Sequence, residues 1–260
     1  MIFDVHTHIY PEAIAARAVA GIGSFYDIAI QMDGRLDTLL AVGAEAGIEG
    51  FLVHAVATTP GQIGSLTNFI ASCVQAHPGK LVGFTSSHPA SQNLDEELET
   101  AVKMGLKGIK LHPDFQSFNA DCPEAMRIYE RMEGRLTLLV HTGDYRTQYS
   151  KPARILNIAK AFPKLQIICA HFGGWSEWQA GARVLGQSGV YVDTSSTQYA
   201  CTPAEVRGLM DAFGTDRLLF GSDYPMWNPV NELEMLDKLF RTQAEREAVL
   251  YGNAAKLFGL

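Results

Sequence analysis

Short, nearly continuous apolar segments recur along the chain, separated by stretches with helical spacing. The apolar segments are rich in Val, Ile, Leu and Phe, as is typical of parallel strands covered on both faces. They predict eight strands, at residues 2–8, 50–56, 81–89, 108–113, 136–143, 166–174, 190–196 and 217–225. The segments between them predict helices, most clearly at residues 36–46, 66–76, 94–104, 123–132, 153–162 and 203–213.

Alternating strands and helices imply a parallel sheet, and eight such units in 260 residues imply a closed (β/α)8 barrel. An open doubly wound sheet is the alternative, but it would carry a glycine-rich phosphate loop where this chain reads HTHIYPE. We therefore predict an α/β protein with the TIM-barrel fold, built as one domain over residues 1–260. Two segments exceed a minimal barrel: residues 9–35, with a length typical of an active-site lid, and an extra C-terminal helix pair at about residues 231–260.

The composition, 47% hydrophobic and 19% charged, is that of an ordinary soluble globular protein. The formal charge of −7 argues against a nucleic-acid partner, because Lys and Arg supply most of that affinity. The four cysteines form no CxxC pair, so we expect reduced thiols.

No apolar segment reaches the ~18 residues needed to span a bilayer, and the N-terminus lacks a secretory signal. We expect a cytoplasmic protein without a membrane partner, in the homodimeric form common among soluble enzymes.

Seven of the eight histidines lie in or at the carboxyl end of a predicted strand, where (β/α)8 enzymes build their active sites. His6 and His8 are two residues apart on one strand, so their rings share a face. A metal ion explains this pair better than two buried polar rings with separate partners. His141 in VHTG and His171 in AHFGG follow apolar segments directly, so both should project into the barrel mouth.

Asp223 in GSDYP follows the last strand, which lies beside the first strand in a closed barrel. A lone buried carboxylate is costly, but a divalent cation would stabilise it, and it could then accept a proton from bound water. A helix N-cap or turn role ahead of Pro225 is the alternative. Imidazole and carboxylate ligands suit Zn²⁺, Mn²⁺, Fe²⁺ or Co²⁺, and we expect one divalent ion, zinc first and manganese second. We expect His54, in the middle of its segment, to be structural or to support the site.

The motifs HTH, KLHP, VHTG, AHFGG, GSDYP and NAAKLFGL together resemble the amidohydrolase superfamily. The resemblance is greatest to the amidohydrolase-related branch, which includes aminocarboxymuconate semialdehyde decarboxylase-like and γ-resorcylate decarboxylase-like proteins. It implies one metal ion bound by His6, His8, His141 and Asp223, with His171 beside the metal-bound water. It also implies that Asp223 or His171 accepts the proton as the water attacks the substrate.

KLHP is the ambiguous motif. Superfamily members with two metals use a carboxylated lysine on the fourth strand as a bridge, but Lys110 lies two residues deeper than His112. We expect an ion pair of Lys110 with Asp4, and His112 in contact with substrate. Loops after the strands add aromatic side chains and an arginine that suit a planar or unsaturated carboxylic acid, with Arg146 on its carboxylate. These candidates are Phe115, Phe118, Tyr145, Arg146, Tyr149, Trp175 and Trp227.

The leading functional prediction is a metal-dependent hydrolase that acts on a small amide, ester or lactone. The first alternative is non-oxidative decarboxylation of an unsaturated or aromatic carboxylic acid. The second alternative is a non-catalytic barrel that only binds metal. Metal-dependent deoxyribonucleases also begin with HxH, but they carry a glutamate in a GEIGLD-like strand where this chain reads GIKLHP. The polymerase-and-histidinol-phosphatase barrel would need more metal ligands than this chain offers.

Overall fold

The computed structural model describes residues 1–260, which form eight parallel strands in the order β1 to β8. The strands are β1 (Phe3–His8), β2 (Gly50–His54), β3 (Leu81–Ser86), β4 (Gly108–Leu111), β5 (Thr137–Val140), β6 (Ile167–Cys169), β7 (Tyr191–Asp193) and β8 (Leu218–Leu219). The barrel closes because the N–H of Val5 donates to the Phe220 carbonyl and that of Asp223 to the His6 carbonyl, both at 2.9 Å. The predicted strands and the TIM-barrel fold are thus confirmed.

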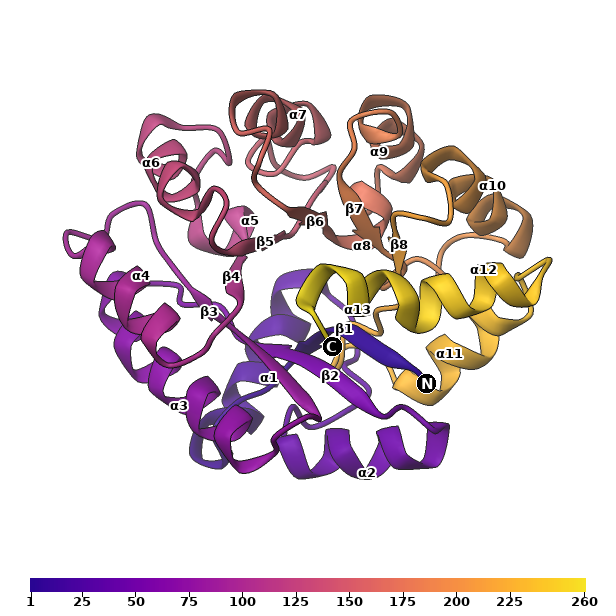
Figure 1. Cartoon of the computed structure of the whole chain (residues 1–260), viewed down its shortest axis with the longest axis horizontal. Helices are drawn as coiled ribbons and strands as arrows, with labels where there is room; N and C mark the ends of the chain where they lie inside the picture. Colours follow the sequence, from indigo (N-terminus) through magenta and orange to yellow (C-terminus); the bar gives the residue numbers. More distant parts are fainter.

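Helices surround this barrel (Figure 1). They are α1 (Glu12–Tyr26), α2 (Leu36–Ala46), α3 (Ile63–Ala76), α4 (Leu94–Lys103), α5 (Pro113–Gln116), α6 (Pro123–Met132), α7 (Pro152–Ala161), α8 (Ala170–Gly173), α9 (Trp178–Leu185), α10 (Pro203–Phe213), α11 (Pro229–Asp237), α12 (Gln243–Glu247) and α13 (Asn253–Phe258), with the 3-10 helix η1 (Pro60–Gln62) and the π-helix η2 (Ala248–Gly252). The six predicted helices are confirmed with small shifts at their ends. Helix α9 was missed, although its buried residues Gly181 and Leu185 lie four positions apart on one helix face.

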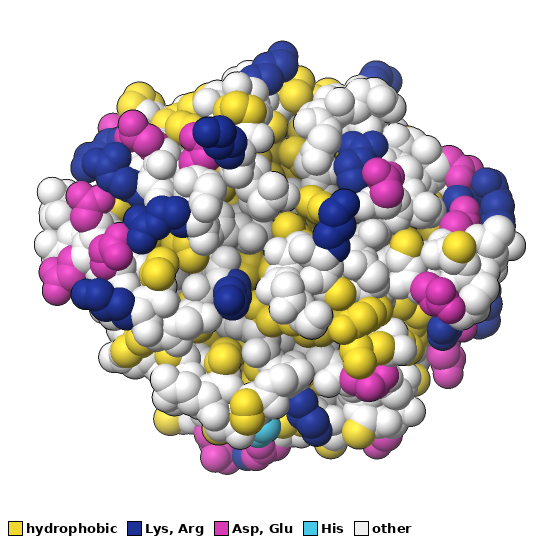
Figure 2. Space-filling model, in the orientation of Figure 1, with side chains coloured by type: hydrophobic (Ala, Val, Ile, Leu, Met, Phe, Trp, Pro, Cys, Tyr) yellow, Lys and Arg dark blue, Asp and Glu magenta, His cyan; other side chains and the backbone are white.

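The C-terminal segment closes the amino-terminal end of the barrel. In Figure 1 the yellow helices α12 and α13 cross this end, close to both chain termini. Phe258 is buried there, with its ring 6.1 Å from that of Phe3 and 5.9 Å from that of Phe84. The same face shows interspersed basic and acidic side chains and scarcely any histidine (Figure 2). The histidines of the predicted site lie at the opposite end, because His8 is the last residue of β1 and His112, His141 and His171 follow β4, β5 and β6.

Helix α1 lies over that opposite, carboxyl end of the strands. The hydroxyl of Tyr26, its last residue, lies 2.7 Å from Nε2 of His112, which follows β4. Nη1 of Arg146, from the loop after β5, donates to the carbonyl of Phe25 at 2.7 Å. The long segment after the first strand thus covers the strand ends, as expected of a lid.

All four cysteines are free thiols in this structure. None of the helices combines the length and the apolar character that crossing a bilayer requires.

Candidate metal centre

Three donor atoms meet at the carboxyl end of the barrel. Nε2 of His6 lies 3.3 Å from Nε2 of His8, and Oδ1 of Asp223 lies 3.3 Å from the first nitrogen and 3.5 Å from the second. Strand β1 supplies both imidazoles from one face, because side chains two residues apart on a strand point the same way. Asp223 reaches them because the chain after β8 pairs with β1 where the barrel closes. All three side chains are buried.

The hydrogen bonds of His6 show what these atoms can hold. Its Nδ1 lies 2.8 Å from Oδ2 of Asp193, so Nδ1 carries the ring proton and Nε2 presents a lone pair. That lone pair faces the carboxylate of Asp223 and the Nζ of Lys110, which lies 3.0 Å away, and Nε2 of His8 faces the same carboxylate. Buried lone pairs and a carboxylate that face one another are stabilised by a cation between them. The donor set therefore fits a divalent ion held by His6, His8 and Asp223.

The charge of Asp223 is consistent with this arrangement. Burial alone would raise the pKa of its carboxyl, but the nearby His6, His8 and His171 outweigh burial and hold that pKa below its usual range. Ser196 Oγ donates to the second carboxylate oxygen at 2.5 Å. Asp223 is thus a fixed carboxylate rather than a helix cap.

The predicted ion pair between Lys110 and Asp4 is wrong. Oδ1 of Asp4 accepts the backbone N–H groups of His6 and Ser222, at 3.1 and 3.0 Å, and its Oδ2 has no partner. Burial raises the pKa of Asp4 to about 7, so this carboxyl is only partly ionised at neutral pH. Lys110 contacts His6 instead, with its Nζ 3.0 Å from Nε2 of the imidazole. Burial lowers the pKa of Lys110 to about 8, which brings the loss of its proton close to neutral pH.

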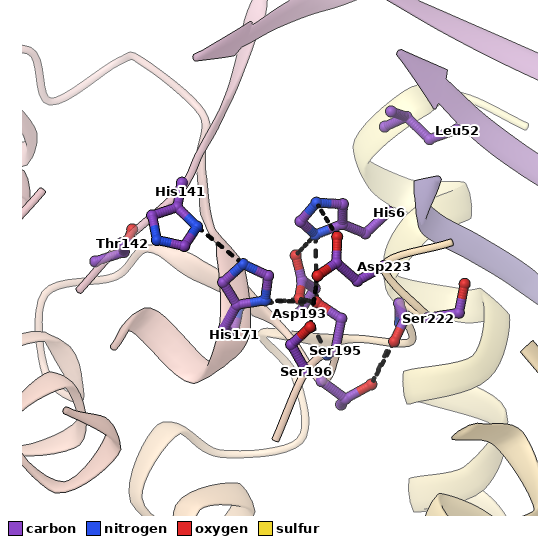
Figure 3. A network of polar contacts seen from close by, with 12 residues as sticks. His6, Leu52, His141, Thr142, His171, Asp193, Ser195, Ser196, Ser222 and Asp223 are labelled. Carbon is purple, nitrogen blue, oxygen red and sulfur yellow. Dashed lines mark hydrogen bonds and ion pairs between the residues drawn. The ribbon is translucent and has the colours of Figure 1, made fainter. Parts of the chain in front are cut away.

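A chain of hydrogen bonds joins His171 to the same centre (Figure 3). Nδ1 of His171 lies 2.9 Å from Oγ of Ser195, which donates to Oδ1 of Asp193 at 2.5 Å. Asp193 therefore orients His171 through one oxygen and His6 through the other. Burial alone would raise its pKa, but His6 and His171 hold it below the usual range. We did not predict Asp193 or Ser195, although VDTSS ends a strand as GSDYP does.

His141 lies beside His171 rather than in direct contact with the β1 histidines. Its Nε2 donates to the Gly143 carbonyl at 2.9 Å, so its Nδ1 presents a lone pair. That Nδ1 lies 3.1 Å from Nε2 of His171, which also presents a lone pair because Nδ1 of His171 donates to Ser195. Burial lowers the pKa of both rings to about 3, so both are neutral at pH 7. A proton or a metal ion would relieve this pair of facing lone pairs.

His112 lies at the site, as predicted, between two parallel rings. Its ring centroid is 3.8 Å from that of Phe115 and 4.0 Å from that of His141. Nδ1 accepts the backbone N–H of Phe115, so Nε2 carries the proton and donates to the hydroxyl of Tyr26. This bond fixes the end of helix α1 over the centre.

Arg146 is engaged within the protein. Its Nε and Nη2 donate to the two carboxylate oxygens of Asp144 at 3.0 and 2.7 Å, and its guanidinium lies over the ring of the buried Trp175. With Nη1 on the Phe25 carbonyl, it holds the end of helix α1. Tyr145, the next candidate, is 69% exposed.

Two further aromatic candidates pack within the structure. Trp227 donates from Nε1 to Oγ of Ser196 at 2.8 Å, and Ser196 in turn donates to Asp223. The indole thus positions the carboxylate of Asp223. Phe118 is buried in the hydrophobic core.

A narrow pocket opens onto the centre. Its floor is polar, and Ile22, Tyr26, Phe115 and Met226 add apolar and aromatic walls. The lining residues are His6, His8, Ile22, Tyr26, Lys110, His112, Phe115, His141, His171, Asp223, Pro225 and Met226. The structure therefore brings His6, His8, His112, His141, His171, Phe115 and Asp223 of the sequence candidates to one pocket.

Glu232, a buried acid on α11, predicts a pH-dependent stability. It accepts from Gln198 Nε2 at 3.3 Å, and burial raises its pKa from the usual 4.5 to about 8. The folded state therefore binds this proton more tightly than the unfolded state does. The resulting contribution of Glu232 to the free energy of unfolding is complete below pH 4.5 and is lost as pH rises toward 8. The Glu232→Gln variant carries a neutral side chain of the same size, so its stability does not fall with pH in this way. Its Tm relative to the native protein should rise between pH 5 and pH 9, by about 3 °C for each kcal/mol involved. An equal Tm difference at both pH values in thermal unfolding would contradict the assignment.

Comparisons with known proteins give a family match and one distant relative. The sequence model of a family described as Amidohydrolase matches residues 3–260. The uncharacterized protein y4mH of Sinorhizobium fredii (strain NBRC 101917 / NGR234) is 22% identical over 285 residues, which cover 99% of this chain and 95% of that protein.

Two solved structures share the fold over the whole chain. A dihydroxybenzoic acid decarboxylase from Polaromonas sp. JS666, with bound manganese and the inhibitor 2-nitroresorcinol, has a TM-score of 0.76 at 17% identity and covers 100% of this chain and 97% of its own. An amidohydrolase from Burkholderia multivorans with bound HEPES has a TM-score of 0.77 at 17% identity, with 100% of this chain and 99% of that chain covered. At 17% identity, the similarity to these two structures shows that this chain shares their fold.

Proposed function

The chain belongs to the amidohydrolase family of metal-dependent enzymes, and from this premise we propose that it hydrolyses a small amide, ester or lactone. The observation that carries the proposal is the convergence of His6 Nε2, His8 Nε2 and Asp223 Oδ1 beneath a pocket at the barrel mouth. These residues would hold one divalent ion, with His141 as the fourth ligand. Zinc and manganese both suit this donor set, and the similar Polaromonas decarboxylase binds manganese. When bound, the ion would polarise the substrate carbonyl and lower the pKa of a water molecule.

The chain's own groups would then move the proton. Asp223 is a fixed carboxylate and can accept the proton of the attacking water, while Nε2 of His171 is kept free of a proton by Ser195 on the other ring nitrogen. Water adds its oxygen to the carbonyl carbon, and the carbon–nitrogen or carbon–oxygen bond breaks. The proton passes through Asp223 or His171 to the leaving nitrogen or oxygen, so the products are an acid and an amine or alcohol.

Decarboxylation is the second candidate, favoured by the aromatic pocket walls Tyr26 and Phe115 and by the fold shared with the dihydroxybenzoic acid decarboxylase. We rank hydrolysis first for two reasons. Arg146 is engaged by Asp144 and Phe25, and Lys110, the cationic side chain that lines the pocket, is engaged by Nε2 of His6 at 3.0 Å, so neither is free to bind the carboxylate of a free acid. In addition, the ionised Asp223 is poised to accept a proton rather than to donate one to a substrate carbon.

The direct test is a substrate panel on protein loaded with zinc or manganese. Small lactones, esters, amides, and unsaturated and aromatic acids are each incubated, and acid release and carbon dioxide are both recorded. We expect acid release from at least one acyl substrate without carbon dioxide. Carbon dioxide formed as an aromatic or unsaturated acid disappears would establish a carboxy-lyase instead. No turnover of any class by metal-loaded protein would favour a non-catalytic barrel.

A further inference from the structure

A second cavity, of about 550 Å³, lies between helices α1 and α3, beside the metal centre. Helix α1 lines it with Ile14, Ala18, Ile22 and Phe25, spaced three or four residues apart and hence on one helix face. Ala15 is the only buried residue of this helix. The apolar face of α1 therefore borders a groove instead of the protein core.

The opposite wall is mixed: apolar side chains alternate with Thr58, Gln62 and Ser65, and the buried Asp114 adds a carboxylate at the end near Phe115. Leu66 and Phe69 come from α3, and Ala55 and Val56 from the loop after β2. A volume of this size lies within the roughly 300–1,000 Å³ usual for small-molecule sites, which are lined mainly by hydrophobic side chains. The groove is thus large enough for an aliphatic chain or an aromatic ring.

The groove adjoins the metal pocket. Ile22 and Phe115 line both cavities, and the ring of Phe115 stacks on His112 inside the pocket. These two side chains therefore form the wall that the two cavities share, and a molecule whose reacting group lies at the metal centre would reach the groove past them.

The lining of this groove includes one cationic side chain, that of Arg17. Arg17 lines it, is exposed, and has no carboxylate within ion-pair distance, whereas Arg35 on the neighbouring segment pairs with Glu12 at 2.8 Å. Arg17 precedes Ile22 by five residues, which places it about 7.5 Å farther along the helix. A free guanidinium beside an apolar groove suits the carboxylate end of an amphipathic molecule.

We propose that the groove binds the apolar arm of the substrate and that Arg17 binds a carboxylate at the far end of that arm. The substrate is then an amide, ester or lactone with an aliphatic or aryl arm that ends in a carboxylate. Its orientation, with the hydrolysable group at the metal, rests on the proposed function. Binding in the groove does not, so it can be measured without turnover.

The test is calorimetric binding of octanoate and of the uncharged octanamide to the metal-loaded full-length protein. We expect octanoate to bind at least tenfold more tightly than octanamide. Ala18→Trp fills the groove and should weaken both ligands at least tenfold, whereas Ala13→Trp, at an exposed position outside the groove, should change neither. Arg17→Gln should remove the preference for octanoate and leave octanamide binding unchanged. Metal content of each variant, measured in parallel, should equal that of the native protein.

Several outcomes would overturn the proposal. If octanoate does not bind the native protein, or binds Ala18→Trp as tightly as the native protein, the groove is excluded as its site. A preference for octanoate that survives Arg17→Gln places the carboxylate elsewhere. A dimer in sedimentation that Ala18→Trp converts to monomer assigns the groove to a second copy of the chain. Failure of the hydrolase panel leaves these binding results unaffected, so the two proposals fail separately.

Discussion

Asp223→Asn should lower kcat by about 10³-fold and leave the fold intact, an effect within the range of losing a general base. Asn keeps the size of the side chain and an oxygen that can accept from Ser196, so the local packing is preserved. It cannot accept the proton of the attacking water, and it presents a neutral group to the centre of His6 and His8. Steady-state kinetics on an active substrate and thermal unfolding measure the two parts of this prediction.

The matched control is Asp216→Asn, the same change at an exposed position before β8. This variant should keep native kcat and Tm. If Asp223→Asn retained more than a tenth of native kcat, Asp223 would not be the group that accepts the proton.

The second large effect is expected on removing His8. Its Nδ1 has no hydrogen-bond partner, and its Nε2 faces Asp223 and His6, so His8→Ala removes a metal donor while breaking few protein contacts. Loss of a supporting residue costs roughly 10–100-fold in metal affinity, and loss of a ligand should cost about 100-fold or more. Titration of chelator-stripped protein with zinc, together with activity, tests this.

His54→Ala is the control for His8→Ala. His54 lies close enough to His6 and His8 to join a three-histidine cluster, and the ring centroids of His54 and His8 are 4.4 Å apart. Both ring nitrogens of His54 are buried without partners. We assign it no ligand role, so its removal should change zinc affinity less than about tenfold. Equal losses in the two variants would show that the ion lies among the three histidines instead of between β1 and Asp223.

The strands and the buried helices follow from local patterns in the sequence. Helices α2, α6 and α10 begin and end as predicted, because apolar periodicity and the prolines at the first turns of α6 and α10 are local properties. Helix α1 has only Ala15 buried, so it leaves a weaker pattern, and only its length and position marked it as a lid.

The site was predictable where strand position alone decides it. His6, His8 and Asp223 converge because β1 and the end of β8 are neighbours in any closed eight-stranded barrel. The partners of loop side chains depend on tertiary packing. Arg146 is bound by Asp144 and by the end of α1, a contact between residues 121 positions apart that no local pattern encodes. Lys110 was misplaced for a similar reason, since its choice between Asp4 and His6 depends on how far it reaches into the barrel.

The central claim is a divalent metal ion bound by His6, His8 and Asp223, and the metal content of the protein tests it most directly. The protein is purified without added metal or chelator and analysed by elemental mass spectrometry against its measured concentration. We predict about one equivalent of zinc, manganese or another divalent transition metal per chain, and less than half of that in His8→Ala. Less than a tenth of an equivalent in the native protein, with no binding of added Zn²⁺ or Mn²⁺, would contradict the account.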